Sequence, residues 1–443
     1  MSKLKVGILG ATGTVGQRMI QLLERHPWFE VSAVAASDNS AGKNYAQVTR
    51  WMLETAIPET VGRMTVQSCQ PGLECDFVLS GLPSSIAEET ELQLAKAGMP
   101  VLSNASSHRM KSDVPLLIPE INPQHLEALQ LQKQRIGSRG FLVTNPNCSV
   151  IGLIFPMAAL HRKFGLEAVH VVTMQALSGA GYPGVASLDI IDNVLPSIDL
   201  GGEDRKIETE PLKILGEWRN GNFVNAPMRI SAMTHRVNVR DGHLEAVSVK
   251  LSRNASREEV ETAIRDFTSP IDELQLPSAP RPVMLLESHV QRPQPRLDRD
   301  RAQGMGVVVG PVSPCSVLDY KFRLLSHNTI RGAAGAAILN AELMYRIAFA
   351  LGVGLTAFGG AVILPYVTVF PGVGGQFVVL MFTVVVLGGL GSVAGAVVGG
   401  IAVGIIQSLS ALFFPIQLQN LVLFIVFIIV LALRPQGLIG ASR

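Results

Sequence analysis

Cys148 lies in the stretch VTNPNCSVIG, directly after two residues that favour the start of a helix. Pro146 cannot continue a preceding helix but fits just before a new one, and Asn147 is a suitable N-cap. We therefore expect Cys148 at or near the first helical turn, where free backbone N–H groups and the helix dipole stabilise a thiolate and can bind an oxyanion. A free cysteine is often only a small buried hydrophobe, so this position alone leaves both readings open.

Later stretches contain polar residues that could serve such a nucleophile. In MQALSGAGYPG, Gln175 ends an expected strand and precedes a loop of small residues, 178–181, suited to close approach of a ligand. In GGEDRKIETEPLKILG, Glu203 and Lys206 are one helical turn apart and so share a face. Taken singly, a capped loop and a surface ion pair would explain these features equally well.

The stretch THRVNVRDGHLEAV adds Arg236 and His243, which we expect in one strand-like hairpin. An ordinary solvated strand would have the same pattern. Histidine has an unperturbed pKa near neutrality, which suits an acid–base group.

Gly7, Gly10, Gly13 and Gly16 recur every three residues across the first expected strand-to-helix turn. Such a turn lets the backbone approach a pyrophosphate, and the helix N-terminus supplies N–H groups and a positive dipole end. The sequence therefore predicts a dinucleotide site. The residues of this turn expected to bind the cofactor are Gly10, Thr12, Gly13, Thr14 and Val15.

The end of the second expected strand, VAASDNSAGK, bears on the choice of nucleotide. An NAD site usually has an acidic residue there, which takes the ribose hydroxyls. Here Ser37 is near the expected place, and Ser37, Ser40 and Lys43 could accept a 2′-phosphate. NADP is favoured, although Asp38 directly after Ser37 would argue for NAD.

The expected elements give two soluble domains. Buried strands at LKVGIL, FEVSAVAAS, DFVLSGLPS and MPVLSNAS suit an α/β fold with a Rossmann-type doubly wound sheet over residues 1–143. A helix with a kink near Pro156 and then longer strands suit an α+β catalytic and dimerisation domain over 144–327. A helix at 328–346 is expected to complete the first domain.

The composition limits the class of protein. The chain has 443 residues, enough for two or three domains, and a formal net charge of +2 that gives no indication of nucleic-acid binding. Its four cysteines show no metal-ligand spacing and no dense disulfide pattern, which favours a reducing compartment without a metal site. The apolar run at the N-terminus is too short for a signal peptide. We therefore expect the enzyme-like part in the cytoplasm.

Residues 347–433 contain no Asp, Glu, Lys or Arg, a composition unsuited to a soluble surface. Four apolar segments, about 347–366, 376–390, 393–414 and 418–433, predict an all-α transmembrane tail over 347–443. Four crossings would leave Arg346, Arg434 and Arg443 on one side, and the positive-inside tendency makes that side cytoplasmic. The full chain is therefore expected in the cytoplasmic membrane.

Residues 1 to about 346 resemble the aspartate-semialdehyde dehydrogenase family along their whole length. The motifs that carry the resemblance are GATGTVGQ, SNASSHRM, NPNCSV, QALSGAGYPG, GGEDRKIETEPLKILG, RVNVRDGH and HNTIRGAAGAA. It implies NADP-dependent reductive dephosphorylation of aspartyl 4-phosphate, in biosynthesis of lysine, threonine and methionine. It also implies a homodimer or homotetramer formed through the catalytic domain.

The resemblance assigns roles to single residues. Cys148 would form a thioester, His243 would act as acid–base group, and Gln175 would orient the acyl group. Around the nicotinamide, the resemblance implies the loop at Gly81 and Asn328, with Ser178 and Gly179 also binding the cofactor.

The charges of the substrate have matching partners under this resemblance. Arg236 would bind the α-carboxylate, Glu203 the α-ammonium, and Lys206 with Arg109 the phosphate, while Asn147 would fix the acyl group or phosphate. The alternative with the same chemistry is N-acetyl-glutamyl-phosphate reductase, whose blocked amine would give Glu203 no purpose. Glyceraldehyde-phosphate dehydrogenase is more distant, because its motif around the cysteine differs from NPNCSV.

The tail resembles a different family. VVVLGGLGSVAGAVVGG and LRPQGLIG are similar to the end of a branched-chain amino-acid ABC transporter permease. The earlier spans and the ATPase-coupling loop of that family are missing, and no G-x-x-x-x-G-K-[ST] motif occurs. A transport module with the enzyme as passenger is the alternative function. The same sequence would result from a natural membrane-tethered enzyme, an engineered fusion or a gene-model artefact.

Overall fold

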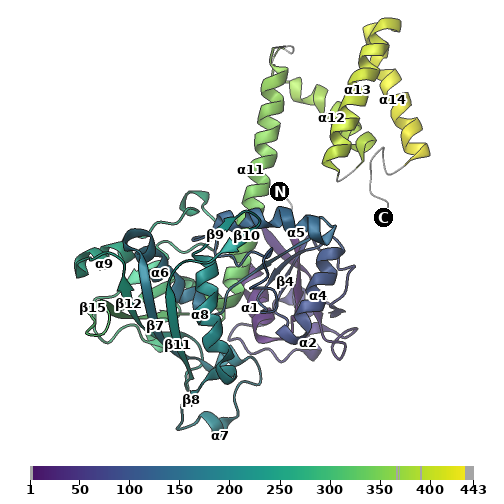
Figure 1. Ribbon diagram of the computed structural model, residues 1–443. Helices are drawn as coiled ribbons and strands as arrows, with labels where there is room; N and C mark the ends of the chain where they lie inside the picture. The colour runs from purple at the N-terminus through teal and green to yellow at the C-terminus, as the bar shows by residue number, and fades with distance from the viewer. Residues whose placement is uncertain (1–2, 366–367, 369, 390–391, 435–443) are drawn as a thin grey trace. The chain divides into compact units, whose positions relative to one another are not determined.

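The computed structural model describes residues 3–365, 368, 370–389 and 392–434. The chain divides into two compact units, Met1–Ala350 and Leu351–Arg443, each described here by itself. Figure 1 shows strands and helices in the first unit and only helices in the second.

The first sheet of unit 1 is entirely parallel and has the order β3-β2-β1-β4-β5-β6. Its strands are β1 (Leu4–Leu9), β2 (Phe29–Ala36), β3 (Gln67–Ser68), β4 (Phe77–Ser80), β5 (Pro100–Ser103) and β6 (Phe141–Thr144). Its helices are α1 (Thr14–Leu23), α2 (Tyr45–Val48), α3 (Glu59–Gly62), α4 (Ser84–Lys96) and α5 (Ala128–Ile136). The strand order reverses between β1 and β4, where doubly wound sheets bind ligands at the carboxyl ends of their strands. The predicted Rossmann-type sheet is thus confirmed.

The second sheet is mixed and has the order β13-β14-β16-β12-β7-β11-β8, with β15 paired to β16. Its strands are β7 (Leu166–Gln175), β8 (Leu195–Pro196), β11 (Arg229–Arg236), β12 (His243–Leu251), β13 (Met284–Leu286), β14 (Val307–Val309), β15 (Ser313–Pro314) and β16 (Tyr320–Ser326). A separate ribbon pairs β9 (Glu217–Arg219) with β10 (Asn222–Val224).

The predicted hairpin joining Arg236 and His243 is wrong. Arg236 ends β11 and His243 begins β12, but β7 lies between these two strands. β11 runs parallel to β7 and β12 runs antiparallel to it. The connection therefore crosses the end of β7, which brings Gln175 between the two side chains in strand order.

The helices of the second sheet are α6 (Val150–Phe164), α7 (Ser187–Ile190), α8 (Gly202–Ile214), α9 (Arg257–Arg265) and α10 (Pro295–Asp298). α6 packs against α8, α9 and four strands of the sheet, and most of its residues are buried. It runs without interruption through Pro156, so the helix does not break there.

The closing helix differs from the prediction at both ends. A π-helical turn, Ile330–Ala334, precedes α11 (Gly335–Ile363), which passes the expected end at residue 346. The stretch Gly335–Leu343 is buried in unit 1 and joins its cores. Arg346 marks a change of composition, but no proline follows it before Ile363, and α11 continues through four glycines in that stretch.

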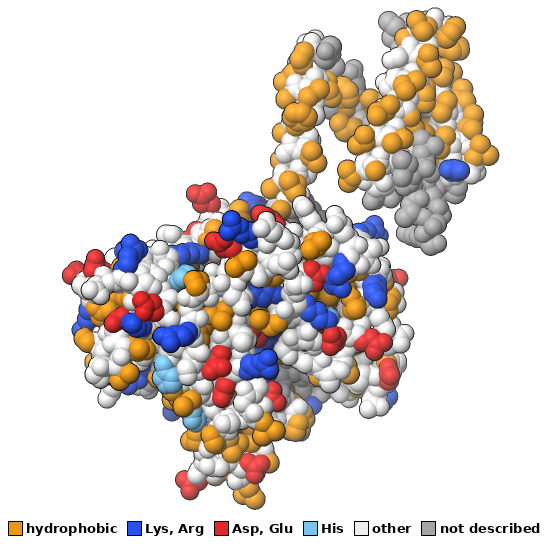
Figure 2. Space-filling model, in the orientation of Figure 1, with side chains coloured by type: hydrophobic (Ala, Val, Ile, Leu, Met, Phe, Trp, Pro, Cys, Tyr) orange, Lys and Arg blue, Asp and Glu red, His pale blue; other side chains and the backbone are white. Residues whose placement is uncertain are grey.

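Unit 2 contains α12 (Val373–Gly388), α13 (Val393–Phe413) and α14 (Ile416–Leu433). Figure 2 shows apolar side chains covering these helices, in contrast to the mixed charges on unit 1. A Cβ at Gly388 would lie 2.0 Å from the carbonyl oxygen of Gly395, so glycine allows α12 and α13 to pack closely.

Only two helices in the described residues are long and apolar enough to cross a membrane by length and composition, Ile330–Ile363 and Val393–Phe413. The other two apolar helices are shorter, namely Val373–Gly388 (α12) and Leu421–Leu433, which is part of α14. The expectations for residue 390, for the LRPQGLIG motif beyond Arg434 and for Arg443 fall outside the described residues.

Candidate active site

One cavity of about 730 Å³ brings the glycine turn and Cys148 together at the carboxyl ends of the parallel strands. Its walls come from both sheets, from α8 and from the turn before α11. The predicted site residues that line it are Gly10, Thr12, Gly13, Thr14, Val15, Ser37, Gly81, Arg109, Asn147, Cys148, Ser178, Gly179, Glu203, Lys206 and Asn328. A dinucleotide and a nucleophile can therefore meet in this cavity.

Five predicted residues do not line it. One of them is Lys43, whose Nζ donates to the carbonyl of Asn39 at 2.7 Å. Gln175, Arg236 and His243 are buried directly behind the wall, at 1%, 6% and 0% exposure. Ser40 lies further along the β2 loop, where its N–H donates to the carbonyl of Ser37 at 2.8 Å.

The glycine turn after β1 has the shape that a pyrophosphate needs. Gly10 has φ +69°, and a Cβ there would lie 2.7 Å from the carbonyl oxygen of Gly81 in the loop after β4. Gly13 is the N-cap residue of α1, whose first N–H groups border the cavity. Side chains in place of these glycines would fill the space beside the turn. The glycines present therefore fit a dinucleotide.

Ser37, at the end of β2, lines the same cavity and is exposed. Asp38 is exposed but is not among the lining residues. Of these two residues, only Ser37 with its hydroxyl borders the cavity, in accord with the predicted preference for NADP.

The sulfur of Cys148 lies 3.2 Å from Nε2 of His243. On the other side of the ring, Nδ1 accepts a hydrogen bond from the backbone N–H of Ala176, just after β7, at 3.0 Å. Because Nδ1 is an acceptor, the neutral imidazole carries its proton on Nε2 and points it at the sulfur. The geometry makes His243 a hydrogen-bond donor to Cys148.

The protonation states differ from the expectation. Burial raises the pKa of the Cys148 thiol to about 12; Glu203 adds to this shift, while Arg236 opposes it. Burial and the nearby Arg236 hold the pKa of His243 well below its usual range. The directions of both shifts favour a neutral thiol beside a neutral imidazole, in contrast to the stabilised thiolate and near-neutral histidine pKa expected from the sequence.

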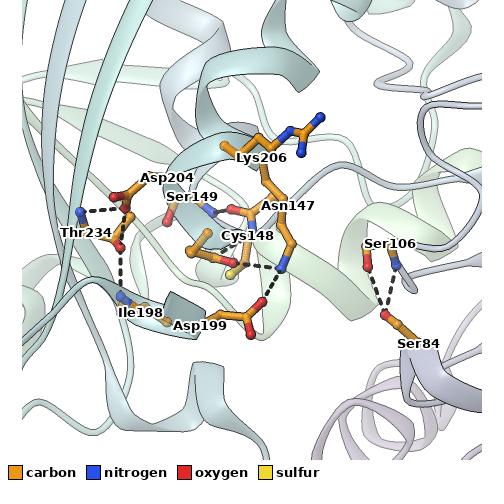
Figure 3. Close-up of polar contacts among 12 residues, drawn as sticks. Ser84, Ser106, Asn147, Cys148, Ser149, Ile198, Asp199, Asp204, Lys206 and Thr234 are labelled. Carbon is orange, nitrogen blue, oxygen red and sulfur yellow. Dashed lines mark hydrogen bonds and ion pairs between the residues drawn. The ribbon is translucent and has the colours of Figure 1, made fainter. Parts of the chain in front are cut away.

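The helix start explains part of this difference. α6 begins at Val150, so Cys148 lies in the turn just before it. Oδ1 of Asn147 accepts from the N–H of Ser149 at 2.9 Å and from that of Val150 at 3.5 Å, as a capping residue does (Figure 3). The N–H groups expected to stabilise the sulfur are thus bound by Asn147.

Glu203 and Lys206 form the predicted pair on one face of α8, with Oε2 and Nζ 3.1 Å apart. Oε1 of Glu203 accepts from Nδ2 of Asn147 at 2.7 Å and from Nε2 of Gln175 at 3.4 Å. Lys206 also reaches Asp199 at 3.5 Å (Figure 3). An anionic and a cationic group therefore face the cavity next to Cys148.

Two arginines lie on the polar side of the cavity, Arg109 in its wall and Arg236 behind it. Nη1 of Arg236 donates to the carbonyl of Ala176 at 2.8 Å. A Cβ at Gly179 would lie 2.8 Å from that Nη1, so a larger residue there would displace the guanidinium. Arg109, in the loop after β5, lines the cavity and is 7% exposed.

Sequence reasoning missed three residues that hold this site. Glu210 and Lys213 follow Glu203 by two and three turns on the same face of α8, and that spacing was readable in GGEDRKIETEPLKILG. Gly332 is needed because a Cβ there would lie 2.8 Å from Cβ of Cys148. Nothing in the local sequence indicated this close approach.

No group of three or more His, Cys, Asp or Glu side chains in the part of the chain that the structure describes is placed to hold a metal ion.

Three family models match successive parts of the chain. "Semialdehyde dehydrogenase, NAD binding domain" matches residues 5–129, and "Semialdehyde dehydrogenase, dimerisation domain" matches 157–331. "Branched-chain amino acid transport system / permease component" matches 331–431. The second and third matches meet at residue 331, which lies before the change of composition after Arg346.

Curated relatives match the first part at high identity. An aspartate-semialdehyde dehydrogenase of Archaeoglobus fulgidus is 47% identical over 345 residues, which cover 78% of this chain and 98% of that protein. One from Aspergillus fumigatus is 46% identical over 353 residues, covering 77% and 97%.

Solved structures agree with these matches. The structure of aspartate semialdehyde dehydrogenase with NADP from Candida albicans has a TM-score of 0.72 and 41% identity, covering 78% of this chain and 99% of that one. A Vibrio cholerae structure, at 24% identity and a TM-score of 0.62, shares the fold. The similarity thus extends over nearly the whole length of these proteins.

Proposed function

The chain belongs to the aspartate-semialdehyde dehydrogenase family, and on that premise we propose how the Cys148 cavity converts aspartyl 4-phosphate to aspartate 4-semialdehyde with NADP. This reaction serves the biosynthesis of lysine, threonine and methionine. The observation that carries the assignment is the single cavity in which the glycine turn borders the Cys148–His243 contact.

The residues that would hold NADP are the backbone of Gly10 and Gly13 at the pyrophosphate and Ser37 at the 2′-phosphate. When bound, the reduced cofactor supplies the hydride. Asn328 donates through Nδ2 to Oγ of Ser178 at 2.8 Å, and this pair borders the cavity on the side of Cys148 where the nicotinamide would lie.

Cys148 is the nucleophile. Its sulfur attacks the acyl carbon of the substrate, the bond between that carbon and the phosphate oxygen breaks, and the thiol proton ends on the departing phosphate. The product on the enzyme is a thioester. After hydride addition, the carbon–sulfur bond breaks, the semialdehyde leaves, and the sulfur regains a proton from water.

His243 stabilises negative charge on the sulfur through its Nε2–H, which faces Cys148 at 3.2 Å. A neutral imidazole cannot give up this proton fully, so its contribution is a hydrogen bond that strengthens as the sulfur becomes anionic. This role replaces the full proton transfer expected from a histidine with an ordinary pKa.

The charged groups of the cavity match those of the substrate. Arg236 would bind the α-carboxylate and Glu203 the α-ammonium, while Lys206 and Arg109 would bind the phosphate. Asn147 holds its side chain against Glu203, which places it to orient the acyl group beside Cys148.

Steady-state kinetics test this function directly. With aspartate semialdehyde, inorganic phosphate and NADP the enzyme should turn over, and with N-acetyl-glutamate semialdehyde it should be poor, because the blocked amine leaves Glu203 unpaired. Glu203→Ala should reduce the difference in kcat/KM between the two substrates. The opposite ranking would assign the chain to the N-acetyl-glutamyl-phosphate reductases.

The match of residues 157–331 to a dimerisation domain shows that this part of the family associates. We extend this to a homodimer or homotetramer formed through residues 144–327. Sedimentation of the enzyme with and without its tail measures the assembly.

The tail inserts into a lipid bilayer in our proposal. α12 and α14 have 16 and 18 residues, about 24 and 27 Å at 1.5 Å per residue, and can cross a core of about 30 Å with local thinning. Four crossings return the chain to its starting side and keep the enzyme in the cytoplasm, with the full chain in the cytoplasmic membrane.

The permease match over 331–431 favours a second candidate function, a transport module. Flux of branched-chain amino acids into vesicles that contain the full chain tests it. Uptake at the level of empty vesicles would leave the tail as a membrane tether.

A further inference from the structure

The carboxylate of Glu210 on α8 connects two segments of the site that are distant in the sequence. Its Oε1 accepts from Nη1 of Arg109 at 2.9 Å, and its Oε2 accepts from the backbone N–H of Asn147 at 2.6 Å. Glu210 is only 2% exposed. Asn147 directly precedes Cys148, so one carboxylate joins an arginine of the cavity wall to the loop of the nucleophile.

Arg109 is held at more than one point. Its Nη2 donates to the carbonyl of Asn104 at 2.6 Å, which with the Glu210 contact fixes the plane of the guanidinium. Lys213, one turn after Glu210, donates to the carbonyls of Arg109, Lys111 and Val114 at 2.7, 2.8 and 2.8 Å. One face of α8 thus holds both the side chain and the backbone of this segment.

We propose that Glu210 is a positioning residue that fixes the separation between the anion-binding guanidinium of Arg109 and the sulfur of Cys148. The inference rests on the proposed function only in naming the anion as the substrate phosphate. Removal of the carboxylate would leave Arg109 without its anionic partner and the N–H of Asn147 buried without an acceptor. Lys213 supports the same arrangement from the backbone side.

The matched control is Glu208 on the same helix. Its Oε1 accepts from the backbone N–H of Ala232 on β11 at 3.0 Å, and it does not line the cavity. Glu208→Gln makes the same chemical change as Glu210→Gln. In both variants a carboxylate that accepts from a backbone N–H loses its charge. A general effect on α8 would appear in both variants.

The experiment uses the full chain in detergent. We measure the KM for inorganic phosphate, the phosphate concentration that protects Cys148 from iodoacetamide, and the Tm. Glu210→Gln keeps one oxygen and adds N–H donors, so it can accept from only one of its two partners. Both phosphate readouts should rise about tenfold or more, as expected for a lost charge-assisted hydrogen bond, while Glu208→Gln stays within about twofold of wild type.

A folded Glu210→Gln protein that needs no more phosphate than wild type would overturn the inference, even if its Tm is lower. The protection readout needs no turnover, so a wild-type protein without dehydrogenase activity would refute the proposed function and still decide this inference. If inorganic phosphate fails to protect wild-type Cys148, the inference is wrong. Should Glu210→Gln not fold, Glu210→Asp, which is too short to reach both partners, should show the same rise in both readouts.

Discussion

The backbone N–H of Ala176 donates to Nδ1 of His243 at 3.0 Å and thereby sets which ring nitrogen carries the proton. In a protonated ring Nδ1 would also carry a hydrogen, so Nδ1 and the N–H of Ala176 would be two donors facing each other. Together with burial and the charge of Arg236, which lower the pKa of His243, the contact keeps the imidazole neutral. The side chain is thus an N–H donor to the sulfur of Cys148.

We expect His243 to stay neutral at pH values well below 6.5. Histidine labelled with ¹³C at Cε1 should show no shift change for this residue between pH 8 and about 6. His243→Asn identifies the signal. A titration midpoint at or above 6.5 would contradict the burial argument.

The same shift has a consequence for stability. Because the folded-state pKa of His243 lies below the unfolded value, the unfolded chain takes up the proton first as the pH falls below about 6.5. Through this group the free energy of unfolding decreases as the pH falls below that value. Chemical denaturation of wild type and His243→Asn should show a smaller decrease in the variant.

Replacement of Cys148 by Ala should abolish thioester formation and lower kcat by at least about 10³-fold, because it removes the sulfur that attacks the acyl carbon. Binding of NADPH, followed by its fluorescence, should stay nearly unchanged, since the glycine turn is untouched. Cys69→Ala and Cys315→Ala are the controls, as neither residue lines the cavity. Normal turnover in the Cys148→Ala protein would refute the mechanism.

Wild type should have a higher kcat/KM with NADPH than with NADH. Ser37→Asp should reduce this ratio about tenfold or more, because a carboxylate there would repel the 2′-phosphate. Asp38→Asn, at the exposed neighbouring position, should change the ratio little. Equal use of both cofactors by wild type, with a strong effect of Asp38→Asn, would mean that Asp38 faces the ribose.

A chain that ends after Ala350 should be soluble without detergent and keep full dehydrogenase activity, because the buried part of α11 ends near Leu343. The full chain should require detergent, and a reporter fused after Arg443 should lie in the cytoplasm. A full chain that is soluble in buffer would contradict the membrane proposal. An inactive truncated enzyme would show that the tail completes the fold.

The sequence by itself determined the features that depend on local pattern. These features follow from residues close together in the chain. They are the alternation of buried strands with helices, the glycine spacing after β1, and the one-turn separation of Glu203 from Lys206. The absence of charged residues over 347–433 likewise separated the enzyme from the tail.

Tertiary structure decided what depends on neighbours from distant segments. β7 enters between Arg236 and His243, α11 continues past the composition boundary, and Gly332 must be small because Cys148 lies against it. The pKa of Cys148 rises because burial removes water from the thiol, a condition that no local sequence specifies. Glu210 belongs to this class as well: its two partners are 63 and 101 residues away, and only folding brings them to one carboxylate.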